Sequence, residues 1–316
     1  MKTSVALCTY NGETYIREQL MSIQNQTYAV DEIIICDDGS TDNTLKIISS
    51  MGLPNVTIHT AERRYGVSAN FQRAVNLCNG DIIFLSDQDD IWHPDKVERT
   101  IALFAKRPDL QVLFSNGRLV DNTGKTINDK TLFDCVGVNE KARKMMKVGL
   151  GLELFIAGNR ATGAAMALRN TFPYLHTFSD YCHEYIIHDY AIVLLALNEV
   201  ALGYIEDPLI DYRIHSSQQI GMGSYLDHPL GIRTSNIIPT ATIIESHSYP
   251  EKLVQRAHIV AWRERNAHRW FAPISIIYNF SNYSKFYHKR APSMAYDDFQ
   301  QWFDSRCEAL KFRLHK

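Results

Sequence analysis

The sequence has no long apolar run and little cysteine, and these absences limit the classes of protein to which it can belong. No stretch approaches the roughly 20 apolar residues that a helix needs to span a bilayer. The N-terminal apolar stretch turns polar too soon to serve as the hydrophobic region of a secretory signal. The six cysteines form no CxxC pair, and Cys8 and Cys36 end apolar runs as reduced core thiols do. We therefore expect a cytoplasmic protein.

The sequence also lacks a charge excess of either sign. Its formal net charge is −2, which argues against a nucleic-acid partner because such binding usually needs a basic excess. The charge is nevertheless uneven, since residues 250–316 hold 12 Lys and Arg against 6 Asp and Glu. This basic segment also carries aromatic residues such as Trp262 and Trp270. It predicts either peripheral contact with the inner face of the cytoplasmic membrane or a helical addition that packs its aromatics on the core.

The first hundred residues alternate between strand and helix patterns. Runs rich in apolar residues and of strand length occupy residues 4–8, 32–36 and 81–85, and residues 56–59 read as a further strand. Helical patterns lie between them, over residues 14–25, 41–50 and 68–78. This order predicts a doubly wound parallel sheet with helices on both faces, in which ligands bind beyond the carboxyl ends of the strands.

The pattern is mixed after residue 100. We expect a helix over residues 190–198, and strands over residues 112–115, 117–120, 164–168 and 202–205. Residues 121–158 read as irregular, apart from a basic helical piece near residues 141–147. Glycine, proline and serine interrupt regular structure between residues 216 and 250. We therefore predict a catalytic domain over residues 1–220 and a helical extension over residues 221–316.

Polar clusters follow three of the predicted strands, at residues 9–12, 37–42 and 87–90. Asp87 and Asp89 can point the same way from an extended turn, and carboxylates are ligands that Mg²⁺ and Mn²⁺ prefer. Such a cation would neutralise the diphosphate of a nucleotide-sugar. Asp37 and Asp38 could accept hydrogen bonds from a base and a ribose. The alternatives are a solvated acidic loop, Asp90 as a helix cap, and an Asp N-cap followed by a glycine turn.

Four segments in register resemble the family 2 inverting glycosyltransferases with the GT-A fold: residues 9–12, 35–42, 66–70 and 80–92. Two later segments resemble the His–Asp–aromatic and Tyr–Arg–x–His motifs of the rhamnosyltransferase-like branch: residues 188–190 and 211–215. The resemblance covers about residues 1–220. It implies an α/β protein of the GT-A fold, with a mainly parallel central sheet and, beyond it, the helical extension.

The resemblance also assigns roles to individual residues. Nucleotide and donor binding falls to Thr9, Tyr10, Asp37, Asp38, Asp87 and Asp90. The metal ligands would be Asp89, Asp87 and His215. Asp189 corresponds to the base that takes the proton of the acceptor hydroxyl, and its alternative role is the N-cap of the following helix. The acceptor would meet Thr162, Gly163 and His188.

The implied activity is metal-dependent, inverting transfer of a sugar onto a surface polysaccharide intermediate such as O-antigen or capsule. The implied cofactor is Mg²⁺ or Mn²⁺, and the implied acceptor is a glycan on a lipid diphosphate carrier. The donor would be dTDP-rhamnose, with glucosyl or galactosyl transfer from a UDP-sugar as the alternative.

Three other classes compete with this interpretation. A haloacid-dehalogenase-like phosphatase needs D-x-D-x-T/V, which residues 87–91 do not match. A dinucleotide-binding oxidoreductase needs GxGxxG after the first strand, and that motif is absent there. A non-catalytic sugar- or nucleotide-binding module would lack the metal loop or the base. Because Asp87, Asp89 and Asp189 are all present, we favour an active enzyme.

Overall fold

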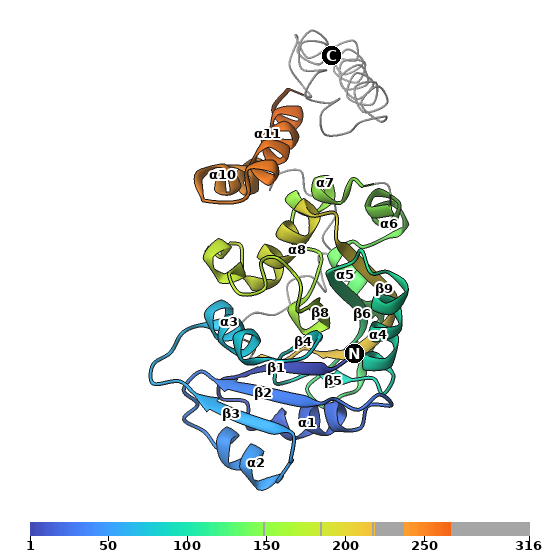
Figure 1. Cartoon of the computed structure of the whole chain (residues 1–316). Helices are drawn as coiled ribbons and strands as arrows, with labels where there is room; N and C mark the ends of the chain where they lie inside the picture. Colours follow the sequence, from blue (N-terminus) through green and yellow to red (C-terminus); the bar gives the residue numbers. More distant parts are fainter. Residues whose placement is uncertain (148, 184, 217, 219–236, 267–316) are drawn as a thin grey trace, which may run out of the picture. The chain divides into compact units, whose positions relative to one another are not determined.

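The computed structural model describes residues 1–147, 149–183, 185–216, 218 and 237–266 (Figure 1). The chain divides into two compact units: Met1–Gly151 with Asn159–Gly231, and Leu152–Gly158 with Ile232–Lys316. The predicted domain boundary at residues 220 and 221 lies outside the described residues and stays a prediction. Within the second unit, the described helices α10 (Ile237–Ser246) and α11 (Glu251–Asn266) pack on each other.

The first unit is built on a sheet whose nine described strands include four parallel neighbours at its N-terminal side. These strands are β1 (Thr3–Thr9), β2 (Glu32–Asp37), β3 (Val56–Thr60) and β4 (Ile82–Ser86), in the order β3-β2-β1-β4. They confirm the four strands predicted from the apolar runs. β1, β2 and β4 are almost wholly buried, as expected for parallel strands that are covered on both faces.

Three helices flank these strands: α1 (Ile16–Gln24), α2 (Thr44–Ser50) and α3 (Val67–Leu77). α3 packs on β1 and β2, while α1 and α2 pack on each other on the opposite side of the sheet (Figure 1). α1 buries Ile16, Leu20 and Ile23, which recur at helical spacing. The doubly wound arrangement predicted for this half is therefore confirmed.

The second half of the sheet mixes strand directions. Its strands are β5 (Ile91–Trp92), β6 (Val112–Val120), β8 (Met166–Arg169) and β9 (Leu202–Arg213). β8 runs antiparallel to β4 and β6, whereas β6 and β9 are parallel and β5 is antiparallel to β9. The two short strands predicted over residues 112–120 are one strand, because its pairing with β9 shifts register instead of ending. The same shift lets β9 continue well past residue 205 and reach the acidic loop after β4.

The prediction of irregular structure over residues 121–158 is wrong. This segment contains β7 (Thr126–Thr131), α5 (Leu132–Val136), α6 (Glu140–Lys147) and α7 (Gly151–Ile156). α5 begins with a capping box in which Thr131 and Asp134 each accept a hydrogen bond from the other's backbone N–H. α6 is the basic helical piece that the sequence predicted.

Two further helices support the site. α4 (Lys96–Lys106) follows the acidic loop, and α8 (His188–Asn198) carries the His–Asp–aromatic segment. Short 3-10 turns lie at Gly163–Ala165 and Phe178–Tyr181. Among the residues that the structure describes, no helix combines the length and the apolar character needed to cross a bilayer.

Candidate functional site

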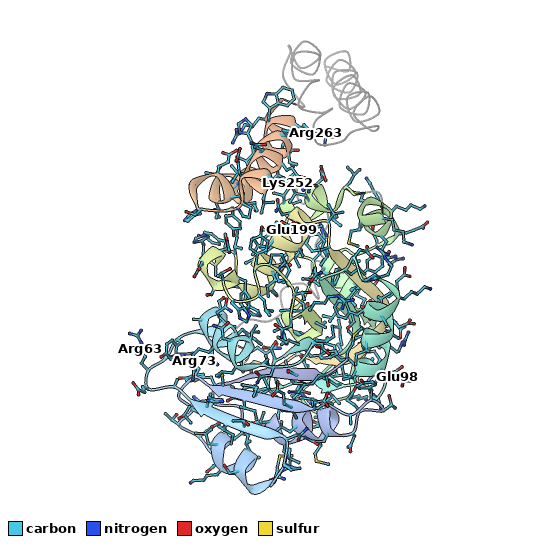
Figure 2. The ribbon with its side chains drawn as sticks, in the orientation of Figure 1. Arg63, Arg73, Glu98, Glu199, Lys252 and Arg263 are labelled. Atoms are coloured by element: carbon cyan, nitrogen blue, oxygen red, sulfur yellow. The ribbon has the colours of Figure 1, made fainter. Side chains whose placement is uncertain are left out.

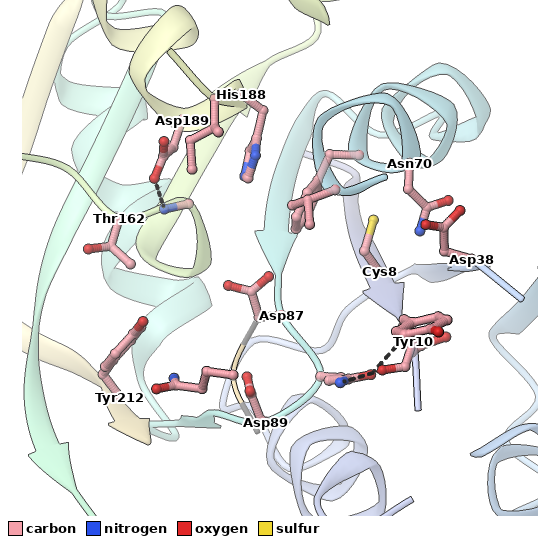
Figure 3. Close-up of a pocket in the computed structure, with 17 residues that line it drawn as sticks. Cys8, Tyr10, Asp38, Asn70, Asp87, Asp89, Thr162, His188, Asp189 and Tyr212 are labelled. Carbon is pink, nitrogen blue, oxygen red and sulfur yellow. Dashed lines mark hydrogen bonds between the residues drawn. The ribbon is translucent and has the colours of Figure 1, made fainter. Parts of the chain in front are cut away.

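An open pocket lies where β1 and β4 end and α8 begins (Figure 3). Most of the residues that the sequence singled out meet here: Thr9, Tyr10, Asp38, Asp87, Asp89, Thr162, Gly163, His188 and Asp189. Three predicted site residues do not line this pocket: Asp37, Asp90 and His215. β1, β4 and α8, which are far apart in the sequence, thus bring these side chains together.

Asp37 is engaged within the β2 loop. Its Oδ1 accepts hydrogen bonds from the backbone N–H groups of Gly39 and Ser40, at 3.1 and 2.9 Å. Its Oδ2 accepts from the hydroxyls of Thr9 and Ser40, at 2.8 and 2.5 Å. Because it accepts four hydrogen bonds and is only 1% exposed, the Asp37 carboxylate stabilises the conformation of the loop. The geometry thus gives Asp37 a supporting position, whereas its neighbour Asp38 faces the pocket.

Asp38 fixes the loop that precedes α3. Its two carboxylate oxygens accept the backbone N–H groups of Tyr65 and Gly66, at 2.6 and 2.9 Å. Gly66 has φ 82°, a left-handed conformation that side-chain-bearing residues rarely adopt. The guanidinium carbon of Arg64 lies 3.9 Å from the centre of the Tyr10 ring. Asp38 and Tyr10 therefore share one end of the pocket with a cation.

The same loop carries more positive charge. Tyr65 lies close to two guanidinium groups: that of Arg63 at 5.5 Å and that of Arg73 at 4.9 Å from its ring centre. Figure 2 shows both arginines at the side of the unit where α3 and β3 lie. Cations beside an open pocket favour a negatively charged ligand such as a phosphate.

Gln88, between the two aspartates of the metal loop, ties that loop to the end of β1. Its side chain accepts from Tyr10 N at 2.9 Å and donates to Tyr10 O at 3.1 Å. A Cβ at Gly12 would lie 2.2 Å from Gln88 Oε1, so this close approach requires a glycine. Hydrogen bonds therefore join the loop after β1, which we predict to bind the nucleoside, to the loop after β4, which we predict to bind the metal.

Asp87 lines the pocket with a buried carboxylate that has two other carboxylates near it. Burial, together with the negative charges of Asp89 and Asp189, raises the pKa of Asp87 to about 8, although the positive charge of Lys96 lowers it. Its carboxylate accepts no hydrogen bond from any residue that the structure describes. Figure 3 shows Asp87 between Asp89 and Asp189. A divalent cation would relieve this repulsion between carboxylates, so the residues present fit such an ion.

Asp89 is hydrogen-bonded by residues at the end of β9 and just after it. His215 Nε2 lies 2.9 Å from Asp89 Oδ2, and Arg213 Nε donates to Asp89 O at 2.7 Å. The described part of the chain contains no cluster of three His, Cys, Asp or Glu side chains arranged for a metal ion. Asp87 and Asp89 could hold a divalent cation, with water and phosphate oxygens completing its shell, while the third predicted ligand, His215, contacts Asp89 in this structure.

Asp90 points away from the pocket. Its Oδ1 accepts Arg213 N at 3.0 Å, its Oδ2 has no hydrogen-bond partner among the described residues, and burial raises its pKa well above the usual range. The alternative that Asp90 caps the next helix is wrong, because Asp95 holds that position. Asp90 instead anchors the acidic loop to β9.

The sequence reasoning missed Lys96. This lysine is buried; its Nζ donates to Ala164 O at 2.9 Å and lies 4.3 Å from the Trp92 ring centre. Burial lowers the pKa of Lys96 to about 7, opposed by the negative charges of Asp90 and Asp87. A signal was available, because a lysine at the first residue of a helix opposes the helix dipole and needs another reason to be there.

Arg213 was also given no role, although the resemblance included it. Its buried guanidinium group donates to Asp89 O, to Asn122 O at 3.1 Å and to Glu18 Oε2 at 2.5 Å. It also lies 4.7 Å from the Tyr15 ring centre. Arg213 therefore joins α1, the acidic loop and the turn after β6.

Asp189 is a buried carboxylate at the start of α8. Its Oδ1 accepts from Asn159 Nδ2 at 3.0 Å and Tyr190 N at 2.6 Å, and its Oδ2 accepts from Gly163 N at 3.2 Å. Burial raises the pKa of Asp189 to about 6, although these hydrogen bonds lower it. The N-cap of α8 is Ile187, so the alternative that Asp189 caps the helix is wrong. A carboxylate with this pKa is ionised at neutral pH and basic enough to accept a proton.

Comparison with known proteins finds a matching family model and several relatives. The model of glycosyl transferase family 2 matches residues 4–172. The dTDP-rhamnosyl transferase RfbG of Shigella flexneri is 29% identical over 231 residues, which are 68% of this chain and 73% of that protein. The chondroitin synthase of Escherichia coli is 34% identical over 128 residues, which are 40% of this chain and 18% of that protein.

A third relative is the UDP-Glc:alpha-D-GlcNAc-diphosphoundecaprenol beta-1,3-glucosyltransferase WfgD of Escherichia coli. It is 29% identical over 119 residues, which are 38% of this chain and 47% of that protein. The chain thus spans less than half of the chondroitin synthase and of WfgD.

A solved structure shares the fold. S. aureus TarS 1–349, in complex with UDP-GlcNAc, matches 100% of this chain and 93% of its own with a TM-score of 0.56 at 15% identity. At 15% identity, this structural similarity is evidence for a shared fold and for nothing more. The predicted GT-A fold is confirmed.

Proposed function

Because the chain belongs to glycosyl transferase family 2, we propose that it moves a sugar from a nucleotide-sugar to a hydroxyl of a surface polysaccharide intermediate. Glycosyl transfer follows from the family, whereas the donor, the acceptor, inversion and metal dependence are proposed. One observation carries the proposal: Asp87, Asp89 and Asp189 line a single pocket. Carboxylates suited to a cation and a carboxylate suited to a base therefore adjoin the same bound molecule.

In the proposed reaction, Asp189 takes the proton of the acceptor hydroxyl as that oxygen attacks the anomeric carbon in line with the leaving diphosphate. A single displacement of this kind inverts the anomeric centre. Asn159 and Gly163 support this role because they hold the carboxylate in one orientation. A divalent cation held by Asp87 and Asp89 would neutralise the charge that grows on the leaving diphosphate.

The other site residues divide between donor and acceptor. Thr9, Tyr10 and Asp38 would contact the nucleoside, and Asp37 would bind the Thr9 hydroxyl and shape the loop that carries Asp38. His215 would support Asp89, and Asp90 would hold the metal loop in place. Thr162, Gly163 and His188 would border the acceptor.

We propose dTDP-rhamnose as the donor, because the match to RfbG extends over 68% of this chain and 73% of that protein. A UDP-sugar is the alternative donor, supported by the shorter match to WfgD. The name of WfgD also supports an acceptor built on a lipid diphosphate carrier. Such an acceptor would place the enzyme at the inner face of the cytoplasmic membrane, with residues 250–316 as the contact.

A thermal-shift experiment tests the donor and the metal loop together. The purified full chain is heated with Mn²⁺ and with each of dTDP-rhamnose, UDP-glucose and UDP-galactose. We expect a rise in Tm with dTDP-rhamnose that is lost in Asp89→Asn and kept in the exposed control Asp129→Asn.

A rise with a UDP-sugar alone would keep the reaction and replace the donor. No rise with any nucleotide-sugar would contradict the proposal. Donor binding without release of nucleoside diphosphate would favour the non-catalytic binding module.

A further inference from the structure

The imidazole of His188 lies in the pocket wall, where no described residue hydrogen-bonds it. The residue is 4% exposed, and neither Nδ1 nor Nε2 is bonded within the described part of the chain. Burial lowers the pKa of His188 to about 3. The ring is therefore neutral at physiological pH and offers one N–H donor and one nitrogen acceptor.

Among the described residues, the ring of His188 makes an aromatic contact and a close packing contact but no hydrogen bond. One face stacks on Phe71, with ring centres 4.3 Å apart and planes inclined by 22°. A Cβ at Gly163 would lie 2.6 Å from His188 Nε2, so the close packing of this segment against the ring requires a glycine. Buried polar groups are nearly always paired in native proteins, and an orphaned pair of ring nitrogens in a pocket points to a ligand atom as the partner.

The position of His188 relates that ligand to the reaction. Gly163, which borders the imidazole, also donates its N–H to the Asp189 carboxylate. Figure 3 shows His188 and Asp189 side by side at the start of α8, with Asp87 across the pocket. A group that bonds His188 thus lies next to the site of proton removal.

We propose, on the basis of the function proposed above, that His188 is a specificity-determining residue that hydrogen-bonds a hydroxyl of a substrate sugar beside Asp189. Two other roles fit less well. His188 makes no hydrogen bond to Asp189, so it does not orient that carboxylate. A ring that resists protonation as strongly as this one is also a poor proton acceptor, so it is no second base.

The test compares His188→Phe with His188→Gln. Phenylalanine keeps an aromatic ring for the stack on Phe71 and removes both nitrogens, whereas glutamine keeps a donor and an acceptor. We expect His188→Phe to lose about tenfold or more in kcat/KM with little change in Tm, and His188→Gln to recover part of that loss. His59→Phe, in β3 and outside the pocket, serves as the matched control.

Single-deoxy analogues of the donor sugar and of the acceptor sugar identify the hydroxyl. Wild-type protein should discriminate strongly against one analogue, and His188→Phe should not. Loss of discrimination on the donor series or on the acceptor series tells which sugar His188 binds.

Two results would overturn the inference while leaving the proposed function intact: a kcat/KM for His188→Phe within twofold of wild type, or equal discrimination by both proteins. Absence of transfer by wild-type protein itself would instead count against the proposed function.

Discussion

Asp37 and Asp38 are adjacent in sequence but meet different surroundings. Asp37 is saturated by bonds from its own loop and from Thr9, whereas Asp38 lines the pocket. We expect Asp37→Ala to lower the free energy of unfolding by about 2–4 kcal/mol, because four buried or half-buried donors lose a charged acceptor. Urea denaturation measures this change. A loss below about 0.5 kcal/mol, the level of an ordinary surface substitution, would contradict the structural role.

Asp189 predicts the pH dependence of transfer. Only the ionised carboxylate can accept a proton, and burial raises its pKa to about 6. We therefore expect kcat/KM to be constant above this pH and to fall about tenfold per unit below it. The profile should be measured with Tm recorded at each pH, so that unfolding is not mistaken for titration. An apparent pKa near the ordinary aspartate value of about 4 would contradict the assignment.

At the scale of elements, β9 holds the acidic loop through Arg213. We expect Arg213→Met to lower the free energy of unfolding by about 2–4 kcal/mol, because Asp89 O and Asn122 O lose their buried donor. The Tm rise with Mn²⁺ and donor should be lost as well. Arg99→Met is the control: its partner Asp207 is exposed, so the loss should stay below about 1 kcal/mol. Equal behaviour of the two variants would show that the bonds made by Arg213 do not position the loop.

β1, β2 and β4 could be predicted because each contains a continuous apolar run, and β3 because Val56 and Ile58 alternate with polar residues. The second half could not be predicted as well. β6 and β9 pair across about 90 residues and shift register, so their lengths depend on contacts that periodicity does not encode. α5 was missed because its capping box has Asp134 at the position where Glu or Gln is the usual signal.

The residues of the site also differ in how well the sequence predicts them. Asp87, Asp89 and Asp189 could be found because short motifs carry them, and the structure places all three in one pocket. Lys96 and Arg213 act through contacts with residues 68 and 124 positions away, at Ala164 and Asp89. Such contacts depend on how strands and helices meet, which no local pattern specifies.

At the scale of the whole molecule, residues 250–316 form the basic segment that we predict to contact the membrane. Of this segment the structure describes residues 250–266, where Arg263 and Arg265 lie in the last turn of α11. We expect the full chain to sediment with phosphatidylglycerol-containing vesicles at low salt, and salt to release it because salt screens surface charge. Pure phosphatidylcholine vesicles are the control. Protein that stays in the supernatant with anionic vesicles at low salt would contradict membrane contact.

In the proposed reaction, sugar transfer depends on Asp189, whereas binding of the donor does not. Asp189→Asn keeps the shape of the side chain and removes its basicity. The most direct measurement is release of nucleoside diphosphate from the donor by wild type and Asp189→Asn, with donor and metal binding followed by Tm in the same samples. We predict a fall in turnover of about 100-fold or more while the donor-dependent rise in Tm persists. Turnover within threefold of wild type would contradict the account.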